Sequence, residues 1–590
     1  MTRFLCALVG AAGCCAALKP ATLRTATEGS DTTPSGIVGG AARGARSAPH
    51  RCVHDDLTSG VAASALHHAV NHSRAHQLYA DGGGGGGDGR RGLQAAGSPD
   101  WQPLRIVAEY VDVGADPAMT PALTAWLQQT LVPAALARWA ALLRVRRVAG
   151  SLHAARGGGG GALQCYLASG DQVVTVADDK YAGGAGWAGA DTVVFVSARQ
   201  TPTCGPAGSG VLAYANSCQR DQLDRPVIGR INLCPASLSL DSRFDFDFQL
   251  GVVVHELGHA LGFESTSWPL FRRPDGSPRT PRNPSNPAQV AASHLVSYTC
   301  GGQALTRPIA SQETLAYFDE RGLPCAWPNV AGRTCVAKFV TETALRAARA
   351  FTGCGSLNGV EIEGADTSPC ALQASHLEQT RWNTGLMCPY AQHRLVVTAV
   401  ELAVLQDSGW YQARWEAADD TRPGLSWAAG AGCAFATSKC VTAGVPAGSR
   451  QYYGSTRDAS GGTAVCTMDR RAVGYVDVSE TANPPAAFRY WPDAPARGGA
   501  LPGVFDFCPG ECPRAAAAPR GAPGCCCART CSRDPSPPVA AVLTPPAAVQ
   551  AYSNLMCEDA ADAFSYAASF GSAFGPGSMC LESTLTRGGG

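Results

Sequence analysis

Two histidines four residues apart lie in the stretch V-V-V-H-E-L-G-H-A-L-G-F, residues 252–263. On an α-helix, positions i and i+4 share one face, so the imidazoles of His255 and His259 can reach the same metal ion. Glu256 follows His255 round the helix and can hold a water molecule at that ion without being a ligand. The pattern predicts a zinc site with Glu256 as the general base of a hydrolase. The alternative is a buried helix with two core histidines.

This helix supplies only two ligands, and a catalytic zinc normally has three protein ligands. Gly262 is placed to end the helix, because glycine tolerates the left-handed backbone of a helix C-terminus. Ser265 stands where the short-spaced metzincin pattern carries its third histidine. The third ligand must therefore come from elsewhere in the chain.

After the first hundred residues, the histidines outside the motif are His153, His294, His376 and His393. His376 lies eleven residues before Met387 in G-L-M-C-P-Y. A methionine in a tight turn beneath the zinc, soon after the third histidine, is the Met-turn arrangement, and it favours His376. An acidic third ligand is the alternative, with Glu264 and Glu313 as candidates.

The N-terminus predicts export. Arg3 precedes an apolar run from Phe4 to Leu18, too short to span a bilayer, which indicates a signal peptide over residues 1–18, with a signal anchor as the alternative. The 25 cysteines favour an oxidising compartment. Later stretches contain no transmembrane helix by their apolar length. Lys+Arg and Asp+Glu number 47 each, so the charge balance gives no reason to expect a nucleic-acid partner.

Residues 19–97 are rich in Ala, Gly, Ser and Thr and include six consecutive glycines at 82–87. Such a composition does not bury enough apolar surface to form a packed domain. The segment contains Cys52 in H-R-C-V-H-D-D-L. A lone cysteine ahead of a zinc site suggests a cysteine switch, in which the thiolate takes the open zinc position. On spacing alone, a disulfide partner is an equal alternative.

The order of predicted elements is that of an α/β zincin, in which strands and a helix precede the zinc helix. Val227–Asn232 is the candidate strand for pairing with an extended peptide substrate. Two helices are expected after the zinc motif, at Val340–Phe351 and Val397–Leu405. The earlier predicted elements are strands at Pro103–Val113, Asp191–Ala198, Val211–Ala215 and Val227–Leu233 and a helix at Thr120–Val148 kinked at Pro133.

Residues 412–590 contain eleven cysteines separated by Pro- and Ala-rich linkers. The clusters at Cys508–Cys512 and Cys525–Cys531 could be metal ligands, but disulfides are the expectation in an exported chain. This region is interpreted as a Cys-rich, disulfide-stapled C-terminal domain that binds substrate or matrix.

Several motifs together resemble the leishmanolysin (invadolysin-like) family of zinc metalloproteases. The resemblance runs with gaps from about residue 50 to 411 and more faintly beyond. It rests on H-R-C-V-H-D, R-P-V-I-G-R-I-N-L-C-P, H-E-L-G-H-A-L-G-F, V-T-E-T-A-L-R-A-A-R-A-F-T-G-C-G, S-H-L-E, L-M-C-P and L-Q-D-S-G-W-Y.

The resemblance implies a metzincin-like α/β zincin core with a long insertion before the third zinc ligand. It implies that His255, His259 and His376 bind one catalytic Zn²⁺, that Glu256 is the base, and that Met387 is the Met-turn methionine. It also implies that Cys52 is the cysteine switch of a zymogen. The sequence departs from the family at Leu377, where an aromatic residue is usual, and at residues 383–385, where acidic or bulky residues are usual.

The expected organisation is a signal peptide (1–18), a pro-region with the cysteine switch (19–97), an N-terminal catalytic subdomain (98–264), a central insertion (265–370), a third-ligand and Met-turn segment (371–411) and the Cys-rich domain (412–590). The expected function is that of a secreted or cell-surface-associated metalloendopeptidase that hydrolyses peptide bonds through a zinc-bound water. Its expected partners are protein or peptide substrates, including extracellular-matrix and cell-surface proteins. The alternative is a secreted adhesion or matrix-binding protein with a degenerate protease domain.

Overall fold

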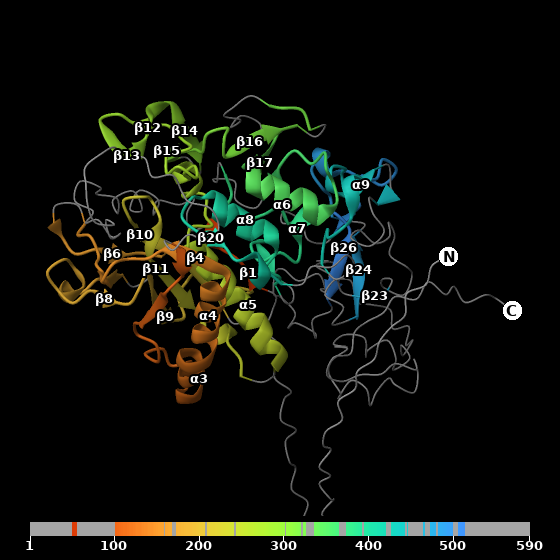
Figure 1. Cartoon of the computed structure of the whole chain (residues 1–590). Coiled ribbons are helices and arrows are strands. Elements are labelled where there is room, and N and C mark those ends of the chain that lie inside the picture. The colour runs from red at the N-terminus through yellow and green to blue at the C-terminus, as the bar shows by residue number, and fades with distance from the viewer. Residues whose placement is uncertain are drawn as a thin grey trace, which may run out of the picture. The chain divides into compact units, whose positions relative to one another are not determined.

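The computed structural model describes residues 50–55 and most of residues 101–513 (Figure 1). Within the second range, the segments outside the described residues are 158–159, 168–172, 207–208, 241–242, 301–302, 320–321, 326–334, 365–372, 392–394, 420–425, 443–444, 447–463, 467–472, 480–481 and 500–504. The predicted signal peptide, most of the pro-region, His393 and Cys525–Cys531 also lie outside the described residues, so the predictions for them stay predictions.

A four-stranded mixed sheet forms the centre of the catalytic part, in the order β10-β11-β9-β3. Strands β3 (Ile106–Tyr110), β9 (Thr192–Ala198) and β11 (Pro226–Leu233) are parallel, and β10 (Ala213–Arg220) pairs antiparallel to β11. The central strand β9 is buried along its whole length. Its alternate residues therefore enter two different hydrophobic cores, one on each face of the sheet.

The long helix expected at Thr120–Val148 is wrong at its C-terminal end. The chain forms α3 (Pro121–Trp126), a π-helical segment (Leu127–Leu131) and α4 (Val132–Leu142), and then turns into strand β4 (Leu143–Arg146). The change of helix type falls just before Pro133, which has no backbone N–H for a regular helical hydrogen bond. β4 forms because it pairs on both sides, with β2 (Trp101–Pro103) and β20 (Gln412–Ala413), and these distant partners override its local helical pattern.

The strand expected at Pro103–Val113 is also interrupted, because β2 ends at Pro103 and β3 begins at Ile106. Between them, Arg105 donates from its backbone and its side chain to the buried carboxylate of Asp191. This ion pair lies where the chain passes from the β2-β4-β20 sheet to the central sheet.

The prediction that Val227–Asn232 pairs with substrate is wrong. These residues lie in β11, which is an interior strand with β10 on one side and β9 on the other. Its backbone groups are already used within the sheet, so it cannot accept an additional strand. The edge strand next to it is β10.

Helix α5 (Arg243–Ala260) carries the H-E-x-x-H motif and packs against β10 and β11 of the sheet and against α4, which itself packs against β3 (Figure 1). Trp139 of α4 donates its indole N–H to the carbonyl of Val254 over 2.9 Å. On the opposite side, a β-carbon on Gly229 of β11 would lie 2.9 Å from the β-carbon of Ala260, so this glycine allows the helix to approach the sheet closely. Gly262 follows with φ +103°, the left-handed backbone expected at this position.

Residues 265–411 contain mainly short antiparallel pairs and two helices that match expectation, one in the central insertion (265–370) and one in the segment that follows it. α6 (Glu342–Thr352) begins after Thr341, and α8 (Ala399–Asp407) begins with a capping box between Thr398 and Glu401. α6 packs against α8, and a short helix α7 (Gln379–Trp382) lies between them in the chain. The strands of this part are β12 (Arg282–Asn283), β13 (Asn286–Val290), β14 (Leu295–Cys300), β15 (Gln303–Pro308), β16 (Leu315–Phe318), β17 (Val336–Phe339), β18 (Val360–Glu361) and β19 (Tyr390–Ala391).

A separate hydrophobic cluster around Trp427, Phe435 and Trp491 lies in the described part of the C-terminal region. The expectation of disulfides there is met by Cys440–Cys508, and Cys354–Cys433 ties this region to the end of α6. Among the described residues, further disulfides lie earlier in the chain, at Cys165–Cys218, Cys204–Cys234 and Cys325–Cys335. The remaining elements are β5 (Ser151–Leu152), β6 (Gln164–Cys165), β7 (Val174–Thr175), β8 (Trp187–Ala188), α9 (Gly432–Ala436), β21 (Val441–Thr442), β22 (Val445–Pro446), β23 (Ala464–Cys466), β24 (Val473–Ser479), β25 (Gly498–Gly499) and β26 (Gly510–Pro513).

Among the described residues, no helix is both long enough and apolar enough to cross a membrane.

Candidate metal centre

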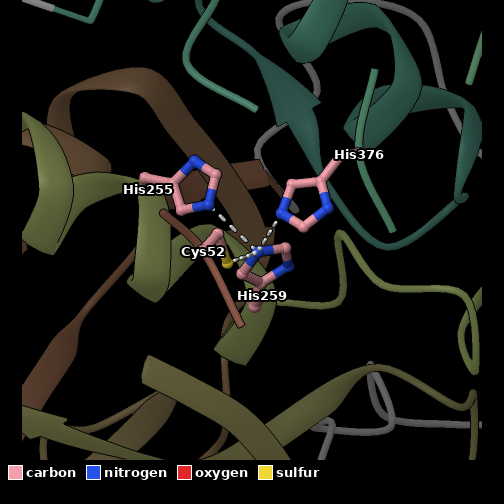
Figure 2. A group of neighbouring side chains, drawn as sticks. All are labelled: Cys52, His255, His259 and His376. Atoms are coloured by element: carbon pink, nitrogen blue, oxygen red, sulfur yellow. Dashed lines mark hydrogen bonds between the residues drawn. The ribbon is translucent and has the colours of Figure 1, made fainter. Parts of the chain in front are cut away.

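Four side chains from three distant parts of the chain converge at one buried point (Figure 2). They are Cys52 from the segment 50–55, His255 and His259 from α5, and His376 from the segment that follows the central insertion. One ligand atom from each lies within 4.8 Å of all the others. The Nε2 atom of His259 is 3.2 Å from Nε2 of His255, 3.2 Å from Nε2 of His376 and 3.4 Å from Sγ of Cys52.

The second nitrogen of each imidazole has its own hydrogen-bond acceptor. Nδ1 of His255 lies 2.5 Å from the Leu386 carbonyl oxygen, and Nδ1 of His259 lies 2.7 Å from the Phe263 carbonyl oxygen. Nδ1 of His376 lies 2.9 Å from a carboxylate oxygen of Asp55. Because Nδ1 donates in each case, the Nε2 lone pairs face one another at the centre of the cluster.

Such an arrangement fits a cation. Two imidazole lone pairs cannot hydrogen-bond each other, whereas tetrahedral zinc with Zn–N distances of about 2.0–2.1 Å would place its nitrogen ligands about 3.3 Å apart. Burial, followed by the charges of neighbouring histidines, holds the pKa of His259 well below its ordinary value, so the ring is in the neutral form that metals bind. The donor set is the one that zinc prefers.

The Met387 segment contacts the cluster through hydrogen bonds and packing. Leu386 provides the acceptor for His255, and the Met387 carbonyl accepts a hydrogen bond from the backbone N–H of Leu377, next to His376. A β-carbon on Gly258 would lie 2.7 Å from the sulfur of Met387, so the methionine packs directly against the H-E-x-x-H helix. The turn therefore connects the first histidine to the third.

Ser265 takes part in delivering His376 even though it is not a histidine. Its backbone N–H donates to the Ser375 hydroxyl over 2.9 Å, and the Trp268 indole donates to the carbonyl of Ala374. The turn after α5 thus holds the segment that carries His376. The third histidine therefore comes from a segment more than a hundred residues after Ser265, whereas the short-spaced pattern has it at that position.

Glu256 is fully buried beside the cluster. Burial raises the pKa of the Cys52 thiol well above its ordinary value, and the charge of Glu256 and a hydrogen bond to it raise it further. Cys52 is buried and is not in a disulfide, so the disulfide alternative for this residue is wrong.

The structure does not bring the alternative ligands to the cluster. The Glu264 carboxylate accepts hydrogen bonds from Ser217 and Arg220, each over 2.6 Å, and Glu313 pairs with Arg273 at the surface. The ring of His153 lies 3.2 Å from the Gly184 carbonyl, and that of His294 lies beside Ser293. Of the histidines described after the motif, His376 alone joins the pair on α5.

Two residues next to Cys52 contact the cluster and were not predicted as site residues. The ring of His54 stacks on His259 with centroids 4.0 Å apart, and its Nδ1 lies 2.8 Å from the Ala215 carbonyl of β10. Asp55 accepts from His376, as described above, and from the backbone N–H of Ser375. Both belong to the motif H-R-C-V-H-D, so the sequence contained the signal, although only the cysteine had a recognisable chemistry.

The family profile described as "Leishmanolysin" matches residues 97–275 and 314–546, which is more than half of the chain. The chain belongs to the leishmanolysin family. The unmatched residues between the two segments lie within the central insertion and contain the β12–β13 and β14–β15 pairs.

Individual relatives agree with this leishmanolysin assignment. The chain is 31% identical over 260 residues to a "Leishmanolysin-like peptidase" of Drosophila melanogaster, covering 44% of this chain and 35% of that protein. It is 26% identical over 325 residues to "Leishmanolysin" of Leishmania major, covering 55% and 42%. It is 26% identical over 418 residues to a "Leishmanolysin homolog" of Crithidia fasciculata, covering 70% and 51%. The chain therefore spans between about a third and a half of the length of these relatives.

Proposed function

We propose that this chain is a zinc-dependent metalloendopeptidase that is exported and that hydrolyses peptide bonds in proteins. One observation carries the proposal: the Nε2 atoms of His255, His259 and His376 converge at a single buried point while each Nδ1 is held by an acceptor. These three residues would hold the zinc ion. When bound, zinc lowers the pKa of a water molecule and polarises a scissile carbonyl group.

Glu256 is the general base in this proposal. It takes the proton from the attacking water and passes it to the leaving amine as the peptide bond breaks. Its burial next to the histidines supports the role, because a water-poor environment keeps the carboxylate from being screened by solvent. Met387 acts through packing against Gly258 and has no chemical step of its own.

The segment 50–55 indicates how an extended polypeptide fits at the centre. Strand β1 (His50–Arg51) pairs antiparallel with β19, and the backbone N–H groups of Arg51 and Cys52 donate to the carbonyls of Gly210 and Pro389. Main-chain pairing of this kind recognises a polypeptide regardless of most side chains. We assign the same path to protein substrates, with the edge strand β10 as the wall on the other side.

Cys52 is the cysteine switch in this account. Its sulfur lies 3.4 Å from Nε2 of His259, which is close to the roughly 3.5 Å expected between sulfur and nitrogen ligands of one tetrahedral zinc. While residues 19–97 remain attached, the thiolate would occupy the position that water needs. Removal of this pro-region would open the centre to substrate.

Export, with release or retention at the cell surface, is the proposed localisation. The disulfides of the catalytic part and of the C-terminal region support an oxidising compartment. The Cys-rich region would then bind extracellular-matrix or cell-surface proteins.

Replacing Glu256 by glutamine tests the activity. We expect Glu256→Gln to keep zinc and to lose peptide hydrolysis by roughly a hundredfold to ten-thousandfold, the usual contribution of a general base. Glu313→Gln is the matched control, because that carboxylate is exposed and pairs with Arg273 away from the cluster. The measurement is cleavage of a casein-type substrate by the processed chain, with and without a chelator. Absence of chelator-sensitive cleavage in the unmodified chain would favour an adhesion protein with an inactive centre.

A further inference from the structure

The three histidines of the centre differ in where their Nδ1 acceptors come from. The carbonyls of Leu386 and Phe263, which hold His255 and His259, belong to the catalytic part of the chain. The acceptor for His376 is Asp55, which belongs to the same N-terminal segment as Cys52. Within the described part of the chain, Nδ1 of His376 has no other hydrogen-bond partner.

Asp55 makes more than one contact with the segment that carries His376. One carboxylate oxygen lies 2.9 Å from the ring nitrogen, and both oxygens are within hydrogen-bond distance of the Ser375 backbone N–H, at 2.9 and 3.2 Å. The side chain is buried. Asp55 therefore fixes both the backbone at Ser375 and the orientation of the His376 ring.

His376 needs such a partner more than the other two histidines do. His255 and His259 share one face of α5, so the helix backbone sets their positions. His376 leaves a segment without regular structure, at the end of an insertion of more than a hundred residues. A carboxylate on Nδ1 fixes the tautomer with Nε2 as the metal-binding atom and makes that atom more basic.

We propose that Asp55 is a positioning residue for zinc binding, so that the N-terminal segment assembles the metal centre as well as closing it. In the unprocessed chain, Asp55 holds His376 in the ligand orientation while Cys52 supplies the fourth ligand. Removal of the pro-region takes away both groups, so the processed chain binds zinc more weakly and exchanges it faster than the unprocessed chain. This inference rests on the proposed zinc site and adds a second role for the segment beyond blocking the substrate path.

The test uses the full-length chain with Glu256→Gln, so that self-cleavage does not remove the segment. Zinc affinity is measured by competition with a chromophoric chelator for this chain and for the same chain carrying Asp55→Ala, Asp55→Asn or Asp56→Ala. We expect Asp55→Ala to weaken zinc binding by roughly 10- to 100-fold, the usual effect of removing such a partner. Asp55→Asn keeps an oxygen acceptor and should restore part of the loss. Asp56→Ala, which removes the next carboxylate in the chain, should bind zinc like the parent.

Cobalt(II) in place of zinc distinguishes positioning of His376 from general loosening of the segment. A thiolate bound to cobalt gives an intense absorption band, so the band reports whether Cys52 is still at the metal. Weaker metal binding with the thiolate band retained is the expected result for Asp55→Ala. Loss of the band would contradict the proposal, because the substitution would then act by releasing the whole segment.

Equal zinc affinity for Asp55→Ala and the parent would also overturn the proposal, while leaving the zinc site itself in place. Failure of the proposed function gives a different result, because then the parent chain would bind no zinc. The faster zinc exchange expected after removal of the pro-region is measured on the unmodified chain. Zinc should transfer to the chelator more rapidly after the pro-region is removed, and an unchanged transfer rate would contradict it.

Discussion

The three histidines of the candidate metal centre come from two sources, and the chain places these two sources in different ways. His255 and His259 are four residues apart on one helix, so local backbone geometry makes them neighbours wherever the helix forms. His376 lies beside them through tertiary contacts, because the turn after α5, the Met387 segment and, in the unprocessed chain, Asp55 hold its segment. Secondary structure sets the positions of the first two histidines, and tertiary structure sets the position of the third. The second source is therefore the more sensitive to changes elsewhere in the chain.

The largest expected effect is on the activity of the unprocessed chain, and it follows from a substitution in the N-terminal segment. Replacing Cys52 by serine removes the sulfur from the centre and leaves the pair on α5 unchanged. We expect the unprocessed Cys52→Ser chain to hydrolyse peptides faster than the unprocessed parent by roughly tenfold or more, because a neutral hydroxyl is a poor zinc ligand and water can replace it. The measurement is peptide hydrolysis before any processing, checked by the intact mass of the chain.

Cys388→Ser is the matched control for that experiment. Cys388 is the other buried cysteine without a disulfide among the described residues, and it is not part of the cluster. Its replacement should not activate the unprocessed chain. Equal activity of unprocessed Cys52→Ser and unprocessed parent would refute the cysteine switch.

A smaller effect tests the contact between the helix and the Met387 turn. A β-carbon on Gly258 would lie 2.7 Å from the Met387 sulfur and 3.3 Å from Trp139. We expect Gly258→Ala to lower the free energy of unfolding by about 1–3 kcal/mol, as overpacking of a filled core usually does, despite the better helix propensity of alanine. Thermal or denaturant unfolding measures the change.

Gly251→Ala is the control on the same helix. A β-carbon there would be 3.5 Å from Leu395, which is an ordinary contact, so this change should be neutral or slightly stabilising. In a Met387→Ala background, Gly258→Ala should cost less than in the parent, because the clashing sulfur is gone. An equal cost in both backgrounds would show that the turn does not pack against the helix in this way.

Sequence reasoning succeeded where the signal was local. The H-E-x-x-H spacing, the glycine that ends α5 and the buried run of β9 each depend on a few neighbouring residues. His376 and Cys52 are too far from that pair in the chain for direct spacing to link them, so His376 was favoured through the downstream Met387 and Cys52 was left level with a disulfide alternative until the family resemblance was added. Their roles as ligands stay predictions.

Errors arose where distant pairing decided the local structure. Residues 143–146 continue a helical pattern, but strands from both sides of the sequence pair with them and make them a strand. Val227–Asn232 has the composition of any buried strand, and only the sheet order shows that it is interior. Asp55 was overlooked because an aspartate beside a cysteine has no motif of its own, and its role depends on the distant His376.

The central claim is that His255, His259 and His376 together hold the zinc that makes this chain a peptidase. The most direct measurement is the zinc content of the purified full-length chain after dialysis, compared among the parent, His376→Ala and His294→Ala. His294 is the matched control, because its ring lies beside Ser293 and is not part of the cluster. We expect about one zinc per chain in the parent and in His294→Ala, and little or none in His376→Ala. A full complement of zinc in His376→Ala would contradict the account.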